Sequence, residues 1–252
     1  MIKISIITVV KNNVNEIEKT INSVLKQTYK NIEYIVVDGF STDGTYEKVL
    51  KYRKKINILQ SRDINLYTAL NKGIRFAKGD YIGHLNGGDV YKSENTIRNL
   101  LKKNIKKVDF FFSDLIILNK DNVVQRDWNF RFINLNKFNF FKIAHPTLFI
   151  NKNIKNLFSY NEKYNISADF LYLLNLSNNK SLKWKHIKNI TILMDSGGVS
   201  SIYKNPMKKG FQDLTILIGA FGIMFGFIIY VKKISIKIPN YIKNLLLRKV
   251  YG

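Results

Sequence analysis

The chain contains 252 residues, 46% hydrophobic and 23% charged, a balance that is typical of a globular protein and excludes wholesale disorder or an all-membrane architecture. It has no cysteine, which excludes disulfides, thiolate metal sites and cysteine nucleophiles. Its 41 Lys and Arg against 18 Asp and Glu give a formal net charge of +23, which favours polyanionic partners such as nucleic acid, anionic lipid or phosphorylated ligands.

Strands and helices alternate along the first third of the chain. β-Branched apolar runs predict strands at 2–10, 32–37, 57–60 and 81–85, and helical spacing predicts helices at 15–25, 45–52 and 66–77. This alternation predicts an α/β fold with an open, mostly parallel sheet flanked by helices. Ligands of such sheets bind at the carboxyl ends of the strands, where polar turns follow in this sequence.

The apolar start of the chain is expected to be a strand and not a secretory signal. It is short, contains Lys3 and has no small-residue cleavage site after it. We therefore expect the body of the protein to stay in the cytosol.

The second half is less regular. The sequence predicts one or two strands in 108–118, a helix at 169–176 and a strand at 184–194, with an aromatic and asparagine-rich segment at 128–141.

The tail begins with an uncharged run of 18 residues, 214–231, flanked by lysines on both sides. As one helix it would be about 27 Å long, against a bilayer core of about 30 Å. Three interpretations are open: attachment in the membrane interface, with 234–250 as a basic amphipathic helix; a single span; or docking on the body of the protein. Basic residues on both flanks favour attachment to the inner leaflet, because the positive-inside rule disfavours one of them outside.

Asp89 closes an Asn-Gly-Gly-Asp turn after the predicted strand 81–85. The two glycines let a ligand approach the backbone closely. A carboxylate there is suited to Mg²⁺ or Mn²⁺ that bridges diphosphate oxygens. The alternative is a turn in which Asp89 only caps a helix.

Asp38 ends the second predicted strand, where a carboxylate can accept the N–H of a uracil or the hydroxyls of a ribose. The alternative is an Asx turn. Asp43 stands in an Asp-Gly-Thr sequence just before a helix, and we expect it to cap that helix.

Asp169 lies at the start of a predicted helix, where an acid is favourable in any case. The functional interpretation is a general base that takes a proton from an attacking hydroxyl. His145, before Pro146, is either a phosphate contact or an ordinary loop histidine, and His84 is expected to be a packed residue.

Taken together, these segments resemble family 2 glycosyltransferases of the GT-A fold, in particular bacterial enzymes that build O-antigen, capsule and exopolysaccharide. The resemblance covers roughly residues 1–203, and each motif alone is weak, whereas seven in order are specific. The matching segments are 4–12 (ISIITVVKN), 36–45 (VVDGFSTDGT), 61–73 (SRDINLYTALNKG), 79–89 (GDYIGHLNGGD), 145–149 (HPTLF), 166–170 (ISADF) and 197–201 (GGVSS).

The resemblance implies roles for individual residues. Those that would hold the uridine of the donor are Thr8, Asp38, Asp63 and Asn71. Asp89 would bind the divalent ion on the diphosphate, and Asp169 would be the catalytic base. Contacts to phosphate or acceptor would come from His145, Gly197, Gly198 and Ser200. The sequence departs from the family pattern at Gly88, where many relatives carry a second acid, and at Asn65 and Thr68.

The resemblance also implies an activity. We expect an inverting transferase that moves a sugar from a nucleotide-diphosphate donor to a hydroxyl of a lipid-linked glycan in surface polysaccharide synthesis. The favoured donor is a UDP-sugar. Residues 1–95 would bind the nucleotide sugar, 96–203 would hold the acceptor and catalytic groups, and 204–252 would associate with an anionic membrane surface at the cytoplasmic face of the inner membrane. No nucleic-acid motif is present, so we expect no nucleic-acid partner. The alternative is a non-catalytic, membrane-bound binding module of the same fold.

Overall fold

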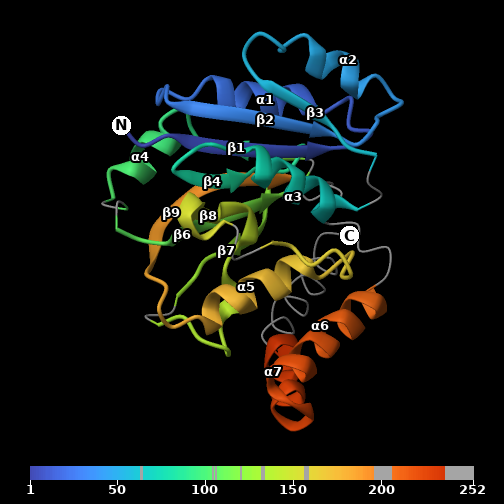
Figure 1. The fold of residues 1–252 in the computed structure, drawn as a ribbon, viewed down its shortest axis with the longest axis vertical. Helices are drawn as coiled ribbons and strands as arrows, with labels where there is room; N and C mark the ends of the chain where they lie inside the picture. Colours follow the sequence, from blue (N-terminus) through green and yellow to red (C-terminus); the bar gives the residue numbers. More distant parts are fainter. Residues whose placement is uncertain are drawn as a thin grey trace.

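A computed structural model describes residues 1–62, 65–103, 105, 107–119, 121–131, 134–155, 159–195 and 206–235. Through them runs one nine-stranded mixed sheet in the order β3-β2-β1-β4-β8-β6-β9-β5, with β7 paired to β6 (Figure 1). The strands are β1 (Ile4–Val10), β2 (Ile32–Asp38), β3 (Asn57–Gln60), β4 (Tyr81–His84), β5 (Val90–Tyr91), β6 (Phe110–Leu118), β7 (Val124–Trp128), β8 (Phe149–Asn151) and β9 (Trp184–Asp195).

The first four strands are parallel, as the alternation of strand and helix predicts. Beyond β4 the sheet changes character, because β8 joins β4 and β6 in antiparallel pairs, and β5 joins β9 in the same way. Only β6 and β9 run parallel in that half. The α/β fold with helices on both faces is confirmed, while the expectation of a mostly parallel sheet holds for the first half alone.

Two cores cover the two faces of the sheet. The helices are α1 (Ile17–Leu25), α2 (Thr45–Leu50), α3 (Leu66–Phe76), α4 (Thr96–Leu101), α5 (Ala168–Asn178), α6 (Pro206–Phe221) and α7 (Ile223–Ser235), with short 3₁₀ turns at Phe140–Lys142, His145–Thr147 and Lys152–Ile154. Buried side chains of α1, α2 and α4 pack in one core, and those of α3, α5, α6 and α7 pack in the other. Strand β1 lies between them and contributes Ile6 to the first core and Ile7 to the second, which explains its continuously apolar sequence.

The uncharged run of the tail is not one helix. Gly222 adopts a left-handed backbone with φ of 77° and turns the chain back, so that α6 and α7 form a hairpin at the lower end of the molecule (Figure 1). Three side chains of the hairpin, Ile216, Leu217 and Ile229, are buried in the core that α5 shares. None of the described helices has the length and apolar character that crossing a membrane requires.

The hairpin depends on glycine at one close contact. A Cβ atom on Gly226 would lie 2.8 Å from the backbone of Leu217 and Ile218 in α6, whereas a Cβ on Gly219 would meet nothing within 4 Å.

We therefore expect opposite effects from two matched substitutions. Gly226→Ala should lower the free energy of unfolding by about 1–3 kcal/mol, because the backbones of α6 and α7 must separate. Gly219→Ala should leave it unchanged or raise it by up to about 1 kcal/mol, because alanine is the better helix former. Urea unfolding of both variants measures the difference, and equal effects would contradict the close contact.

Candidate functional site

The loops that follow β1 and β2 are locally strained. Of the three non-glycine residues with a left-handed backbone in the described part of the chain, two lie here: Asn12 with φ of 50° and Phe40 with φ of 54°. Such conformations cost free energy and are frequent at functional sites. The loops are bonded to each other, since the Asn12 side chain accepts from the amide of Thr42 at 2.9 Å. The two loops at the carboxyl edge of the parallel strands, where ligands are expected, are thus held in a defined conformation by each other.

Asp43 belongs to this framework. Its carboxylate accepts from the amide of Thr45 at 3.0 Å and from the amide of Val14 at 3.1 Å. Hydrogen bonds from Thr45 hold the pKa of this exposed carboxyl below its usual value. The N-cap of α2 is Gly44 and makes no side-chain cap hydrogen bond, so Asp43 is not the cap, but its bond to the amide of Thr45 supports the start of the helix from one residue earlier.

Asp38 is fully buried at the end of β2. Its Oδ2 accepts from the amide of Ser41 at 3.1 Å, but its Oδ1 has no hydrogen-bond partner among the described residues. A buried carboxylate oxygen without a partner is costly, and an N–H or O–H of a ligand would satisfy it. Thr8 lies nearby in β1 with its hydroxyl already engaged, since it donates to the carbonyl of Leu85 at 2.8 Å and pairs with Tyr34 at 3.0 Å.

Asp89 is buried in the turn between β4 and β5. Its Oδ2 accepts from the Asn86 side chain at 2.9 Å. Burial is the largest effect on the Asp89 carboxyl, and it outweighs the hydrogen bonds from the Asn86 side chain and the Asp195 backbone, so that the pKa is raised to about 7. A divalent cation would supply the missing positive charge.

Asp195 was not among the predicted site residues. It ends β9, and the antiparallel pairing of Val90 with Leu193 brings it beside Asp89. Lys19 of α1 lies 3.6 Å from its carboxylate and also pairs with Glu16. One signal in the sequence pointed here, because Asp195 directly follows the predicted strand 184–194 and two glycines follow it closely, as two glycines accompany Asp89.

Asp169 stands in the first turn of α5 and is half-buried. Its Oδ1 accepts from the amide of Phe170 at 2.8 Å and from the Tyr67 hydroxyl at 3.2 Å, and that hydroxyl shares its one hydrogen with the carbonyl of Ile166 at 2.9 Å. Its Oδ2 has no hydrogen-bond partner among the described residues. One oxygen is therefore oriented while the other is free to accept a proton.

The start of α5 is held by α6. The Gln212 side chain accepts from the amides of Ile166 and Ser167 at 3.2 and 3.1 Å, and donates to the Asn165 side chain at 2.9 Å. Buried or half-buried N–H groups at a helix start need such partners. Sequence reasoning missed Gln212, because its partners lie 45 residues or more away along the chain.

Asn71 connects α3 to the segment that leads into α5. Its amide nitrogen donates to the carbonyl of Tyr160 and to the carboxylate of Glu162, both at 2.9 Å, and its oxygen accepts from the amide of Tyr160 at 2.9 Å. Asn65 adds a bond to the carbonyl of Glu162 at 3.1 Å. The Asn71 side chain is thus used within the protein, and its contact with a donor stays a prediction.

Two histidines that are far apart in the sequence lie ring against ring, tilted by 42°. The rings of His84 and His145 lie 4.4 Å apart, and Nε2 of His145 lies 2.6 Å from the Tyr160 hydroxyl. Burial lowers the pKa of His145 to about 3 and that of His84 well below its usual value, so both are neutral. A small cavity of about 20 Å³, room for one water molecule, lies beside His84 and Tyr160. A neutral His145 brings no charge to a phosphate, and its predicted contact remains untested.

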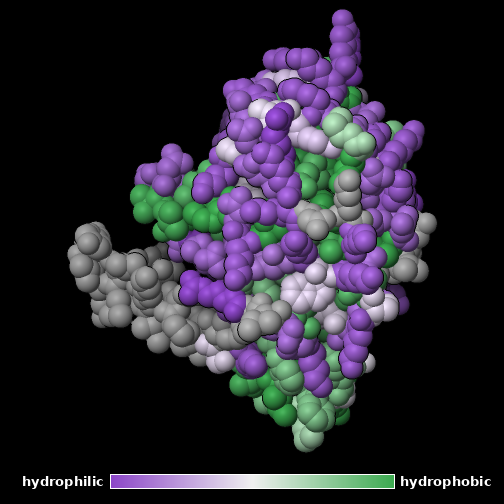
Figure 2. Space-filling view, turned by 90° about the vertical axis from the view of Figure 1, so that its left-hand side faces the viewer, coloured by the Kyte–Doolittle hydropathy of each residue, from purple (hydrophilic) through white to green (hydrophobic). Residues whose placement is uncertain are grey.

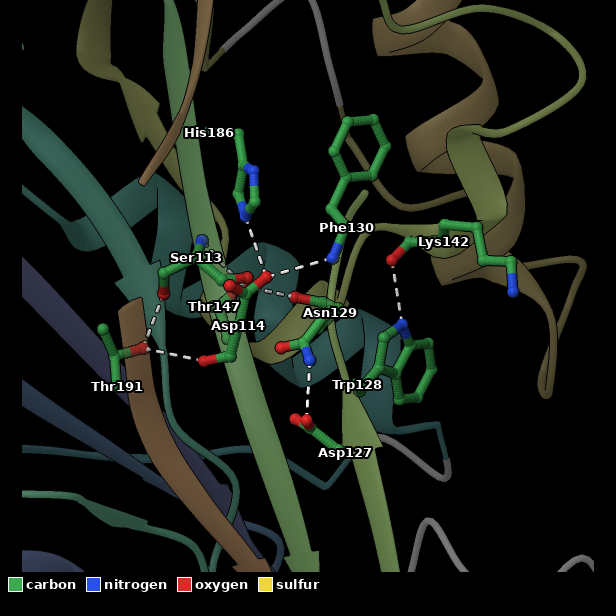
Figure 3. A network of polar contacts seen from close by, with 11 residues as sticks. Ser113, Asp114, Asp127, Trp128, Asn129, Phe130, Lys142, Thr147, His186 and Thr191 are labelled. Carbon is green, nitrogen blue, oxygen red and sulfur yellow. Dashed lines mark hydrogen bonds and ion pairs between the residues drawn. The ribbon is translucent and has the colours of Figure 1, made fainter. Parts of the chain in front are cut away.

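A polar network stabilises the second half of the sheet (Figure 3). Asp114 of β6 accepts from Nε2 of His186 at 2.8 Å and from the amide of Phe130 at 3.1 Å, and all three groups are buried or nearly so. The neighbouring Ser113 pairs with Thr191 at 2.6 Å, where the register between β6 and β9 shifts. The network fixes the path of the aromatic segment that begins after β7. The remaining predicted residues, Asp63, Gly197, Gly198 and Ser200, lie outside the described residues.

Comparison with known proteins decides the family. The model of glycosyl transferase family 2 matches residues 5–172. This range contains most of the sheet, the helices α1 to α4 and the first residues of α5. The chain is a family 2 glycosyltransferase.

Relatives and a solved structure agree with this assignment. The glycosyltransferase RP339 of Rickettsia prowazekii is 43% identical over 108 residues, which cover 42% of this chain and 34% of that protein. The Escherichia coli enzyme WfgD, a UDP-Glc:α-D-GlcNAc-diphosphoundecaprenol β-1,3-glucosyltransferase, is 34% identical over 126 residues, 48% of this chain and 49% of that protein. The matched part is thus half or less of each of these relatives.

The fold is that of Staphylococcus aureus TarS, residues 1–349, crystallised with UDP-GlcNAc. The two share a TM-score of 0.71 at 19% identity, over 86% of this chain and 66% of the other. At this identity the likeness shows the GT-A-like fold alone.

The carboxylate oxygens of Asp89 are of the type that binds divalent cations such as Mg²⁺ and Mn²⁺. Among the described residues no three acidic or histidine side chains gather into a complete metal site. The buried Asp89 carboxylate forms no ion pair with a described residue, although the charge of Lys19 acts on it from a distance, and hard cations such as Mg²⁺ and Mn²⁺ prefer carboxylate and phosphate oxygens. These residues fit a metal ion that would be held by few protein ligands, with oxygens of a diphosphate as the remaining ligands.

The raised pKa of Asp89 makes the stability of the metal-free protein depend on pH. Below about pH 4 the carboxyl is protonated in both states, and the cost of its burial grows as pH rises towards 7, because only the unfolded state ionises freely. Asp89→Asn should therefore stabilise the protein more at pH 8 than at pH 5, by roughly 2–3 kcal/mol.

Urea unfolding in a chelator at the two pH values measures this difference. Asp43→Asn is the control of opposite sign, since its lowered pKa means that the substitution should destabilise the protein at pH 8. A stability gain of Asp89→Asn that is the same at both pH values would show that the carboxyl is not buried as described.

Proposed function

We propose that this glycosyltransferase moves a sugar from a UDP-sugar to a hydroxyl of a lipid-linked glycan, with inversion at the anomeric carbon, in surface polysaccharide synthesis at the cytoplasmic face of the inner membrane. The observation that carries the proposal is Asp169, a half-buried carboxylate with one oxygen oriented by two donors and the other free. The donor and acceptor classes are supported by the substrates in the name of WfgD and by the UDP-GlcNAc bound to TarS.

Donor binding is assigned to the carboxyl edge of the parallel strands. The unpartnered Oδ1 of Asp38 would accept the N–H of uracil, and the strained loop around Phe40 would cover the base. Arg62 lies with its guanidinium 5.1 Å from the Phe40 ring and adds positive charge at this edge. Asp63, Asn71 and the Thr8 backbone are proposed to complete the uridine site.

Asp89 would hold the metal on the diphosphate. A bound Mg²⁺ or Mn²⁺ would offset negative charge on the leaving nucleoside diphosphate. The Asn86 side chain would keep the Asp89 carboxylate in place for the metal. The lysine near this site, Lys19, pairs with Asp195 and leaves the Asp89 oxygens to the metal.

Asp169 would act as the base. Its free Oδ2 takes the proton of the acceptor hydroxyl as that oxygen attacks the anomeric carbon and the bond to the diphosphate breaks. Tyr67 fixes the other oxygen, so the carboxylate does not have to reorient during the reaction.

The test is transfer of labelled sugar from a panel of UDP-sugars to GlcNAc-diphosphoundecaprenol. Asp169→Asn should lower kcat by about 10²–10⁴-fold, because the base is lost, while UDP binding stays unchanged. Tyr67→Phe keeps the base but loses its orienting hydrogen bond, and should lower kcat by roughly fivefold.

Full transfer by Asp169→Asn would remove the base from the mechanism. A wild-type protein that binds UDP but transfers no sugar from any donor would favour the alternative, a non-catalytic binding module.

A further inference from the structure

The turn of the α6–α7 hairpin exposes an apolar surface. Five large apolar side chains at the start of α7, here called the hairpin tip, are 47–76% exposed: Ile223, Met224, Phe225, Phe227 and Ile228. They form the green lower end of the molecule in Figure 2. No charged residue occurs between 214 and 231, so nothing in the hairpin itself makes this end hydrophilic. Exposed apolar patches of this kind mark interaction sites.

Lysines surround the base of the hairpin tip. Lys137 lies with its ammonium 5.2 Å from the Phe225 ring and 5.5 Å from the Phe221 ring, and Lys232 lies 4.9 Å from the Phe138 ring. An apolar end with cations directly behind it fits the boundary between acyl chains and anionic headgroups. A purely apolar protein partner would leave these lysines without a complementary charge.

The dimensions agree with shallow insertion. Lys232 lies seven positions after Phe225 along α7, which is about 10 Å of helix. Amphipathic elements at membrane surfaces bury their apolar part by about 5–10 Å. The hairpin tip would therefore reach the acyl chains just as Lys232 meets the headgroups.

The hairpin is rigidly connected to the site. Asp213 of α6 and Lys233 of α7 form a buried ion pair, and the Lys233 ammonium lies 3.7 Å from the ring of Phe170, next to Asp169. Gln212 holds the first amides of α5. A membrane that receives the hairpin tip is thus held at a fixed position relative to Asp169.

We propose that the hairpin tip inserts into the surface of an anionic bilayer and thereby orients the catalytic site towards acceptors embedded in it. The second part rests on the proposed function, whereas insertion itself does not. This mode of attachment differs from a single membrane span and from attachment through the basic segment 234–250, because the turn between α6 and α7 enters the lipid.

Vesicle co-flotation tests the proposal. The wild-type chain, the double variant Phe225→Asp/Phe227→Asp and the control Val123→Asp/Val124→Asp are compared on phosphatidylcholine vesicles with and without 30% phosphatidylglycerol. The control introduces the same charges at two exposed valines remote in sequence from the hairpin: Val123, which precedes β7, and Val124, its first residue. Wild type and control should bind the anionic vesicles, and the tip variant should bind at least about tenfold more weakly.

Other outcomes overturn the proposal or separate it from the proposed function. Wild-type binding by the tip variant would place attachment elsewhere on the basic surface. A wild-type dimer that the tip substitutions convert to monomer, without loss of vesicle binding, would make a second copy the occupant. Titration of UDP into all three proteins is the independent arm: absence of UDP binding would refute the proposed function while tip-dependent vesicle binding still stands.

Discussion

Asn71 carries the constraint on which the rest of the site depends. This buried amide makes three hydrogen bonds to Tyr160 and Glu162, and so ties α3, which packs on the parallel strands, to the segment that ends in α5. Gly73 lets α3 lie close to β1, since a Cβ there would meet the Ile7 side chain at 2.6 Å. Through these contacts the nucleotide edge of the sheet and the carboxylate of Asp169 have one fixed arrangement. The Tyr67 hydroxyl adds a further link from α3 to Asp169, and the Asn65 side chain adds one to the carbonyl of Glu162.

The acids of the site are kept at a cost in stability. Asp38 has a buried oxygen without a partner, and Asp89 is buried next to Asp195 with a pKa of about 7. Although the chain has a net charge of +23, the Asp38 oxygen lacks a hydrogen-bond donor and the Asp89 carboxylate lacks an ion-pair partner among the described residues. Buried groups of this kind are expected where a ligand completes the structure. A nucleotide and a cation would satisfy both, which is why binding of the two should be linked.

The sequence was informative where local pattern determines structure. Strands β1, β2 and β4 were predictable because parallel strands buried on both faces are mostly apolar, and Asp169 was placed correctly in the first turn of its helix. In the second half, β6 and β9 were also predicted, at 108–118 and 184–194, but β5, β7 and β8 were not, because strands of two to five residues show too little periodicity to detect. The break at Gly222 was missed, since an uncharged run is compatible with one long helix. Gln212 and Asp195 act on partners distant in sequence, and only the pairing of β5 with β9 and the packing of α6 on α5 bring them to the site.

The most direct test of the account is calorimetric titration of UDP into the wild-type protein and Asp38→Asn, each with and without Mn²⁺. The account predicts that wild type binds UDP, that Mn²⁺ strengthens binding, and that Asp38→Asn weakens it by about tenfold, the value of a lost hydrogen bond to a charged group. The metal should still help the variant, because Asp89 is intact. Equal UDP affinity in wild type and variant, or no UDP binding by either, would contradict the assignment of the carboxyl edge as the donor site.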